Sequence, residues 1–235
     1  NAVGAEKDED QPLTIVIDRT DFYPFYYREN AKLVGPLPEV TSAVLSAIGY
    51  MAEFREVPWS RAVDLVTRRQ VDAVAGIFFR PEREFFLHYP RSFPAESRLN
   101  LFVPISSELA FDGDLSVLEN EDIGTVLGWS YKLFTQSQKI GRIDFADEKI
   151  LVRNVALGRI GIGIGNPTSL AKFAREQGLE NHIRVIAPPV ERTPLFTAFS
   201  KKPGHEDLAR RFSTALEAFK ETPAFRKIMK RHGLK

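Results

Sequence analysis

The order of the segments in the first third of the chain constrains its fold more than any other feature. Residues 13–17 and 71–75 are short apolar runs of strand length, and Met51 to Val57 is predicted to form a strand between them. Apolar residues recur at helical spacing within 38–49 and 60–69, which separate these runs. The order strand, helix, strand, helix, strand predicts a parallel α/β sheet with right-handed crossovers.

Ligands of open α/β sheets bind beyond the carboxyl ends of the strands. In this chain the first strand is followed by Asp18 and Phe22, the second by Trp59, and the third by residues 76–83. Three stretches that are far apart in the sequence are therefore predicted to converge on one edge of the sheet, with Gly76 at the turn of the third.

Arg83 is the most informative residue of that edge. It follows Pro81, which suits the first position of a helix because its missing N–H would be unpaired there. A cation in the first helical turn is disfavoured by the helix dipole, unless the helix start and the guanidinium hold an anion together. The alternative is that Arg83 pairs with Glu82 or Glu84 at the surface.

A second α/β series is predicted after a polar stretch at 106–122. Its first strand, Ile123 to Leu127, ends in Gly128 at an expected helix start, so the anion-binding geometry is predicted twice. An apolar run at 149–152 and a helix near 154–157 follow. In residues 158–165 Gly alternates with Ile, which predicts a strand with one Gly face and lacks the spacing of a dinucleotide-binding loop. Strands at 183–186 and 195–199 and helices at 205–220 and 223–231 complete the chain.

The composition excludes several classes of site and partner. The 32 basic and 31 acidic side chains nearly cancel, so no nucleic acid or lipid surface is expected as a partner. There is no cysteine, which excludes disulfides and thiolate metal sites. No apolar run approaches the length of a membrane span, and no signal peptide remains, as in a mature exported protein.

Several motifs together resemble the amino-acid-binding (family 3) type of extracytoplasmic solute-binding proteins. They occur in the family's order over nearly the whole chain, at residues 22–25, 33–35, 58–61, 71–83, 128–131 and 156–159. The resemblance implies the two-lobed periplasmic-binding-protein (type II) fold, in which each lobe is a mostly parallel sheet flanked by helices. Residues 1–95 plus 196–235 would form lobe 1 and residues 96–195 lobe 2, with two crossing hinge strands and a ligand cleft between the lobes.

The same resemblance assigns roles to individual residues. Arg83 would grip a ligand carboxylate, Phe22 would stack on the ligand, and Ser130 would offer its hydroxyl and N–H from lobe 2. Asn166 departs from the family, because it stands where an aspartate usually meets an α-ammonium. Phe78 and Trp129 also replace smaller polar residues, so a more aromatic pocket is expected. The full set of expected ligand-binding residues is Asp18, Phe22, Trp59, Gly76, Phe78, Arg83, Trp129, Ser130, Tyr131 and Asn166.

The resemblance implies a periplasmic protein that binds a small carboxylate-bearing solute by hinge closure and delivers it to an ABC transporter. The expected partners are the solute, an amino acid or other carboxylate, and the membrane permease. We expect a monomer with no metal, no cofactor and no nucleic acid. The rival role is the ligand-sensing domain of a membrane receptor; the terminal helix and lack of a membrane segment favour the free protein.

A dehydratase-like enzyme on the same fold is a further alternative. Catalysis would need a poised acid, base or nucleophile in the cleft. The four histidines, His88, His182, His205 and His232, are far apart in sequence and are expected at the surface. Glu39 is expected to cap the helix that begins beside it. These expectations favour a protein that binds its ligand without turning it over.

Overall fold

The computed structural model describes residues 12–129 and 131–234, and it divides the chain into two compact units. Unit 1 comprises the chain up to Ala95 and from Pro194 onward, and unit 2 comprises Glu96–Thr193. The predicted second boundary, after Leu195, lies beyond the observed one. Leu195 belongs to unit 1 because its side chain is buried in the same apolar cluster as Ile15 and Leu37.

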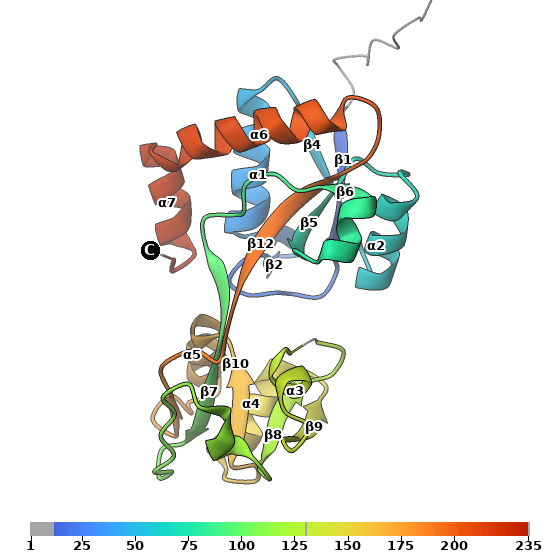
Figure 1. Cartoon of the computed structure of the whole chain (residues 1–235). Coiled ribbons are helices and arrows are strands. Elements are labelled where there is room, and N and C mark those ends of the chain that lie inside the picture. The colour runs from blue at the N-terminus through green and yellow to red at the C-terminus, as the bar shows by residue number, and fades with distance from the viewer. Residues whose placement is uncertain (1–11, 130, 235) are drawn as a thin grey trace, which may run out of the picture. The chain divides into compact units, whose positions relative to one another are not determined.

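The sheet of unit 1 is built around β1 (Leu13–Asp18), which pairs in parallel with β4 (Ala52–Val57) and β5 (Ala73–Phe78). This confirms the predicted parallel layer. Antiparallel to β5 runs β12 (Glu191–Ser200), whose pairing residues in unit 1 are Leu195 to Phe199. The two-residue strand β6 (Leu87–His88) pairs with the end of β12. Figure 1 shows these strands together in unit 1.

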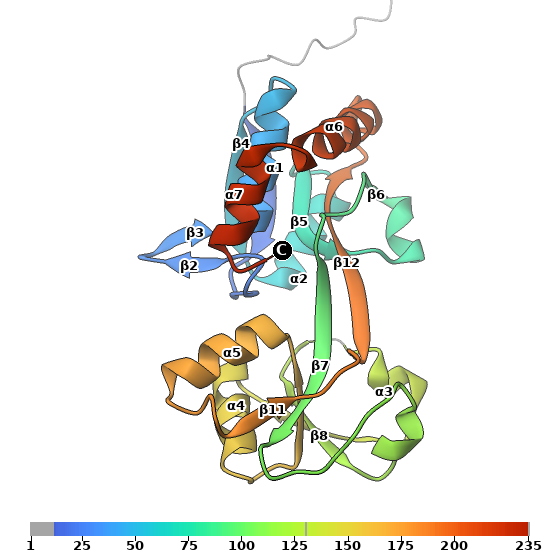
Figure 2. The ribbon, with the colours of Figure 1, turned by 90° about the vertical axis from the view of Figure 1, so that its left-hand side faces the viewer.

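Helices cover both faces of this sheet. Alternate residues of β1 point to opposite faces: Ile15 and Ile17 pack in the cluster that contains α1 (Pro36–Ala47) and α6 (His205–Lys220), whereas Val16 packs in the cluster of α2 (Trp59–Thr67). The last helix, α7 (Pro223–Arg231), contacts α1 and α6. A hairpin of β2 (Tyr27–Glu29) and β3 (Lys32–Val34) projects from unit 1 (Figure 2).

Unit 2 has its own sheet. Its first strand, β7 (Glu96–Pro104), pairs antiparallel with β10 (Ile162–Gly165) and with β11 (Ile183–Val185). From β10 the sheet continues in parallel to β8 (Asp122–Val126) and then to β9 (Gly141–Phe145). The helical segments are η2 (Leu115–Leu118), α3 (Leu133–Gln136), α4 (Glu148–Ala156) and α5 (Pro167–Glu176).

The Gly face of β10 lets neighbouring side chains approach closely, as predicted. A Cβ atom at Gly163 would collide with the ring of Phe102, and one at Gly165 would lie 2.7 Å from Glu148 Oε1. Since separations below 3 Å force something to shift, both positions need glycine for packing. This close approach brings the start of α4 directly against the end of β10.

The apolar run that was expected before the helix near 154–157 is part of that helix. The apolar run at 149–152 lies inside α4, where Leu151, Val152 and Val155 share one buried face. Asp147 begins this helix, since its Oδ1 accepts the backbone N–H of Ile150 at 2.8 Å. The true neighbour of β8 is β9, at the end of the sheet. Three of its five residues are exposed, so its sequence carries no apolar run that marks a strand.

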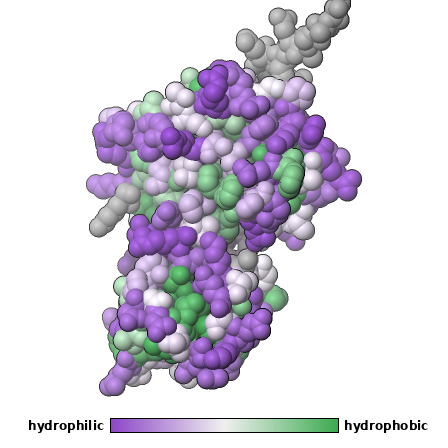
Figure 3. All heavy atoms as spheres, viewed as in Figure 1, coloured by the Kyte–Doolittle hydropathy of each residue, from purple (hydrophilic) through white to green (hydrophobic). Residues whose placement is uncertain are grey.

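Each unit buries separate apolar clusters, two on unit 1 and two on unit 2. In the view of Figure 3 the surface of unit 1 is mostly hydrophilic, and a group of apolar residues is visible on unit 2. Within the described residues, no helix has both the length and the apolar character needed to cross a membrane.

Candidate ligand-binding site

The three predicted stretches of unit 1 meet at one edge of its sheet. Asp18 is the last residue of β1, and it pairs in register with Val57, the last residue of β4. Trp59, the first residue of α2, follows directly, and Phe78 is the last residue of β5. Because these strands are parallel neighbours, the convergence predicted from the sequence is confirmed. The indole of Trp59 is partly buried against the α2-side core.

Gly76 shapes this edge through a β-bulge. On β12, Phe196 pairs with Ile77 and Thr197 with Ala75, so the register skips Gly76. Its φ of 81° favours glycine, and a Cβ atom there would lie 3.0 Å from the ring of Tyr26. Gly76 therefore acts by setting the path of the strand toward Phe78.

An aromatic cluster lies beside the end of β5. The ring of Phe22 lies 5.2 Å from Phe25 and, in an edge arrangement, 6.4 Å from Phe78. Phe25 and Tyr26 are fully buried, whereas Phe22 and Phe78 are only partly buried. The cluster thus has a core side and a side that can contact a ligand.

Arg83 is held by the backbone at the end of β5. Its Nη1 donates to the carbonyl oxygen of Phe78 at 2.8 Å, and the hydroxyl of Tyr89 donates to the same oxygen at 3.2 Å. Partial burial, together with the nearby charge of Arg80, lowers the pKa of the Arg83 guanidinium. Among the described residues no carboxylate forms an ion pair with it, so the alternative of a surface pair with Glu82 or Glu84 is wrong.

The helix starts predicted at the two anion sites are wrong. Pro81–Phe85 forms η1, a 3₁₀ segment of five residues, and it provides little of an α-helix dipole. In unit 2 the four-residue α3 begins only at Leu133, after Gly128 and Trp129. The capacity to hold an anion at Arg83 therefore belongs to the guanidinium itself.

In unit 2 the stretch after β8 differs from the prediction in part. Tyr131 belongs to the core: only 3% of its surface is exposed, its hydroxyl accepts the N–H of Val126 at 2.9 Å, and burial raises the pKa of its phenol. It is therefore removed from the candidate ligand-binding residues. Trp129 is partly buried, and its carbonyl accepts a hydrogen bond from Arg142 at 3.2 Å. Ser130 lies outside the described residues.

Asn166 follows β10 and caps α5. Its Oδ1 accepts the N–H of Thr168 at 2.9 Å, and the residue is 6% exposed. Since only an oxygen can accept this bond, the amide orientation is fixed, and Nδ2, a donor, is the atom left for other contacts. The pair Asn166-Pro167 is a typical helix start that the sequence analysis did not use.

Glu148 is a candidate functional residue that the sequence analysis missed. Its carboxyl group accepts the hydroxyl of Ser169 at 2.6 Å and the backbone N–H of Asn166. The residue is 7% exposed, and burial raises the pKa of its carboxyl group to about 7. An acidic residue in a first helical turn reads as an ordinary surface position, so the sequence carries no signal for this burial.

Two histidines expected at the surface are buried. His205 Nδ1 lies 3.2 Å from Ser200 Oγ, and His205 Nε2 lies 3.3 Å from Asp72 Oδ1. This is a serine, histidine and aspartate constellation, but Ser200 is 0% exposed and its hydroxyl donates to the carbonyl of Val71 at 3.0 Å. No substrate can reach Ser200 in this position, so the cluster ties α6 to the sheet and has no catalytic geometry.

The second buried histidine corrects the assignment of Glu39. His232 Nε2 lies 2.7 Å from Glu39 Oε1, and its Nδ1 lies 2.9 Å from the hydroxyl of Tyr27. Glu39 also pairs with Arg231 at 3.2 Å and makes no cap for α1. These contacts fasten the end of α7 to α1 and to the β2 strand. In the described ranges no group of histidine or acidic residues could hold a metal ion.

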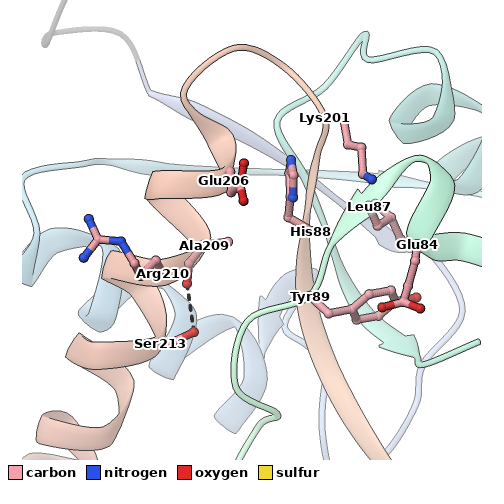
Figure 4. A pocket seen from close by; sticks show the side chains of 9 residues that line it. All are labelled: Glu84, Leu87, His88, Tyr89, Lys201, Glu206, Ala209, Arg210 and Ser213. Atoms are coloured by element: carbon pink, nitrogen blue, oxygen red, sulfur yellow. Dashed lines mark hydrogen bonds between the residues drawn. The ribbon is translucent and has the colours of Figure 1, made fainter. Parts of the chain in front are cut away.

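A polar cavity of about 360 Å³ lies on unit 1 between α6 and the η1–β6 segment (Figure 4). The close-up shows His88 and Glu206 facing each other across it, with Lys201 nearby. None of the predicted ligand-binding residues lines it. Its lining residues are Glu84, Leu87, His88, Tyr89, Lys201, Glu206, Ala209, Arg210 and Ser213.

Comparisons with known proteins agree with this fold. One curated relative is the "Probable amino-acid-binding protein YxeM" of Bacillus subtilis (strain 168), 19% identical over 99% of this chain and 88% of its own length. A solved histidine kinase sensor domain with similarity to periplasmic binding proteins superposes with a TM-score of 0.77 at 20% identity, covering 96% of this chain and 97% of that one.

Another similar structure is an ancestral arginine-binding protein bound to glutamine, with a TM-score of 0.71, 17% identity and coverage of 94% and 96% of the two chains. At such identities these structures show the fold, the two-lobed α/β architecture of periplasmic binding proteins. The sequence model of one protein family matches residues 13–235, nearly the whole chain. The chain belongs to the bacterial extracellular solute-binding proteins, family 3.

Proposed function

We propose that this protein binds a small carboxylate-bearing solute and that Arg83 holds the carboxylate. The observation that carries the proposal is a half-buried guanidinium that donates to a backbone carbonyl and has no carboxylate partner among the described residues. A cation that is partly removed from water is stabilised by an anion, and arginine grips carboxylates with two parallel hydrogen bonds.

The solute's apolar part would contact the aromatic residues of the same edge. Phe22 and Phe78 are each partly exposed, close to the Phe78 carbonyl that accepts the hydrogen bond from Arg83. Trp59 lies after the strand β4 of the same sheet. An aromatic or aliphatic side group would bury apolar area there, which adds affinity without charge. This lining favours an amino acid or a related organic acid over a sugar.

Two classes of solute differ in the group that would contact Asn166: amino acids, which carry an α-ammonium group, and carboxylates without one. YxeM carries the name of an amino-acid-binding protein, and the ancestral binding protein holds glutamine. In this chain Asn166 offers a hydrogen-bond donor and no charge for an α-ammonium group. We therefore propose a carboxylate without an α-ammonium, or an amino acid whose amine is met by Asp18, whose Oδ1 accepts only the N–H of Thr20 within the described chain.

We further propose that residues of unit 2, namely Trp129, Ser130 and Asn166, contact the same solute, so that binding draws the two units together as a hinge. A ligand drives such closure only through contacts that it gains in the closed state. In this role the protein acts in the periplasm, as a monomer, and delivers its solute to the membrane permease of an ABC importer without chemical change.

A sensory role is the second candidate, and the likeness to a histidine kinase sensor domain favours it. Both roles use the same solute site and differ only in output. The complete gene distinguishes them, because a receptor would continue into membrane segments and a signalling domain. Co-purification with a permease would support the transport role.

The proposed function is tested by a thermal-shift panel of standard L-amino acids and their deaminated analogues. A solute at about 100 times its dissociation constant adds roughly 2.7 kcal/mol to stability. The same panel on Arg83→Ala should lose the shift, because removing one partner of a charged pair costs about 2 to 5 kcal/mol of binding.

Arg80→Ala is the matched control. Arg80 carries the same charge three residues away and is exposed, so its removal should leave the shift in place. Equal melting shifts for wild type and Arg83→Ala would reject Arg83 as the carboxylate-binding residue. Turnover of a bound solute by the purified protein would instead point to an enzyme.

A further inference from the structure

Glu148 lies between the starts of two helices. It is in the first turn of α4, and its carboxyl group contacts the first turn of α5 through Ser169 and Asn166. Gly165 leaves the space that the carboxyl group fills, since a Cβ atom there would meet Glu148 Oε1. The buried carboxyl group therefore supports the turn on which Asn166 sits.

When Glu148 is ionised, the Ser169 hydroxyl has one proton for two neighbouring acceptor oxygens. Ser169 Oγ lies 2.6 Å from Glu148 Oε1 and 2.9 Å from the carbonyl oxygen of Asn166. A hydroxyl has a single proton and can donate to only one of these acceptors. If Glu148 is protonated, it donates to Ser169, Ser169 donates to Asn166, and both short contacts become hydrogen bonds.

No basic group of the described residues pairs with Glu148. The charged group that acts on it is Asp147, on the same helix, and its negative charge favours the protonated carboxyl. Tyr131, whose pKa is raised by burial, feels the Glu148 charge but stays neutral. The helix α4 packs against α5 and against the strands β7 to β11. Besides Asp147, the groups of the described residues that act on the carboxyl of Glu148 are the neutral donors of Ser169 and Asn166. Burial places the pKa of the Glu148 carboxyl at about 7, so both states are accessible near neutrality.

We propose that Glu148 is a positioning residue for Asn166, that it acts through Ser169 as a protonation relay, and that the protonated relay is the state that binds solute. The statement that the protonated relay binds solute rests on the proposed function. An ionised Glu148 would place a negative charge behind Asn166, where a solute group that accepts from Nδ2 carries negative charge of its own. Solute binding is then coupled to uptake of a proton by Glu148.

The relay is tested first without any solute. NMR spectra between about pH 5 and pH 9, a range that brackets the carboxyl pKa, follow the backbone amide signals of Asn166 and Ser169. Both should move with one midpoint near pH 7. In Glu148→Gln, which imitates the protonated group, the movement should disappear, and in Ser169→Ala the midpoint should shift because the hydroxyl contacts the Glu148 carboxyl group.

Glu180→Gln, which changes an exposed carboxyl of unit 2, is the control and should titrate like wild type. The relay is rejected if the two amides do not move over this range, or if Glu148→Gln keeps the same midpoint. The latter result would assign the titration to another group.

The coupling between Glu148 protonation and solute binding is tested by thermal-shift panels. The panels use the standard L-amino acids and their deaminated analogues at both ends of the pH range. For any solute that binds, wild-type affinity should be about fivefold higher at the acidic end, at the low end of typical couplings between sites. Glu148→Gln should hold the higher affinity throughout. Unchanged affinity with an intact NMR titration would reject the coupling alone. If no solute binds at the acidic end or at the basic end of the range, the proposed function is rejected. The relay itself would then be judged by the NMR titration alone.

Discussion

Unit 1 and unit 2 each place an ionisable side chain at the carboxyl end of a strand, but they treat its charge in opposite ways. Arg83 in unit 1 is half-buried and has a backbone carbonyl as its hydrogen-bond partner. Glu148 in unit 2 is buried and has two donors but no basic partner among the residues that the structure describes. A guanidinium stays charged at any ordinary pH, whereas a buried carboxyl can escape the cost of its charge by keeping a proton.

The difference explains why the two positions suit different tasks. An obligatory charge without a carboxylate partner among the described residues is available to an anionic solute, and for this reason we propose that Arg83 supplies affinity. A carboxyl group that changes its charge near neutrality can adjust the turn behind Asn166, and this is the controlling role that we propose for Glu148. The predictions that follow test these two assignments separately.

The largest expected effect on stability concerns Glu148→Gln. The folded-state pKa of about 7 lies above the ordinary glutamate value of 4.5. Between these values the native protein binds more protons than the unfolded chain, so wild-type stability falls as pH rises through this interval. Above it, the ionised carboxyl costs up to about 3 kcal/mol. Gln does not titrate, so the variant should gain this amount relative to wild type between pH 4.5 and 8, measured by urea unfolding.

A constant difference in unfolding free energy between wild type and Glu148→Gln over that range would contradict the buried, neutral carboxyl. Glu180→Gln serves again as the control and should show no pH-dependent gain, because the Glu180 side chain is exposed.

A smaller effect is expected from Asn166→Asp. Aspartate caps helices as well as asparagine does, so stability should change little. The new carboxylate would favour solutes with an α-ammonium and disfavour their deaminated analogues, by about 1 to 3 kcal/mol for a charged hydrogen bond. Calorimetry with each member of such a pair measures the switch. An unchanged preference would place Asn166 outside the solute's reach.

The smallest effect is expected from Tyr89→Phe. The hydroxyl shares the Phe78 carbonyl with Arg83, so its loss leaves Arg83 as the side-chain donor to that oxygen in the described structure. A neutral hydrogen bond contributes about 1 kcal/mol. We expect a comparable loss of stability and a smaller change in solute affinity. An affinity loss as large as that of Arg83→Ala would mean that Tyr89 contacts the solute directly.

The two indoles give an optical test of the hinge proposal. Trp59 belongs to unit 1 and Trp129 to unit 2, and both are partly buried. If both contact the solute or lose water on binding, the emission should shift to the blue, and Trp59→Phe and Trp129→Phe should each remove part of the shift. An emission spectrum that stays unchanged while calorimetry detects binding would contradict this role for both residues.

The sequence predicts most of the backbone of this molecule because the signals are local. The helices at 205–220 and 223–231 match α6 and α7, whose apolar spacing and prolines mark them clearly. The strand end at Asp18 follows from the short apolar run 13–17, whereas β5 continues through Gly76 to Phe78, beyond the predicted run 71–75. The sequence analysis missed the edge strand β9 because three of its five residues are exposed and its sequence lacks a clear alternation of apolar and polar residues.

The candidate site was harder to predict because it depends on contacts between distant residues. The burial of His232 depends on Glu39, 193 positions away, and no local pattern encodes that meeting. Arg83 was singled out through its motif as a prediction, and the structure shows that a carbonyl of the preceding strand holds its guanidinium. Glu148 was missed since its partners come from the next helix along the chain.

The central claim is that Arg83 holds the solute's carboxylate, and a double-mutant cycle with the solute as one partner tests it most directly. Calorimetry would measure binding of the best solute from the panel and of its carboxamide analogue, each to wild type and to Arg83→Ala. We expect a coupling energy of at least about 2 kcal/mol between the carboxylate and Arg83. Additive losses, with a coupling energy near zero, would show that the two groups do not interact and would contradict the account.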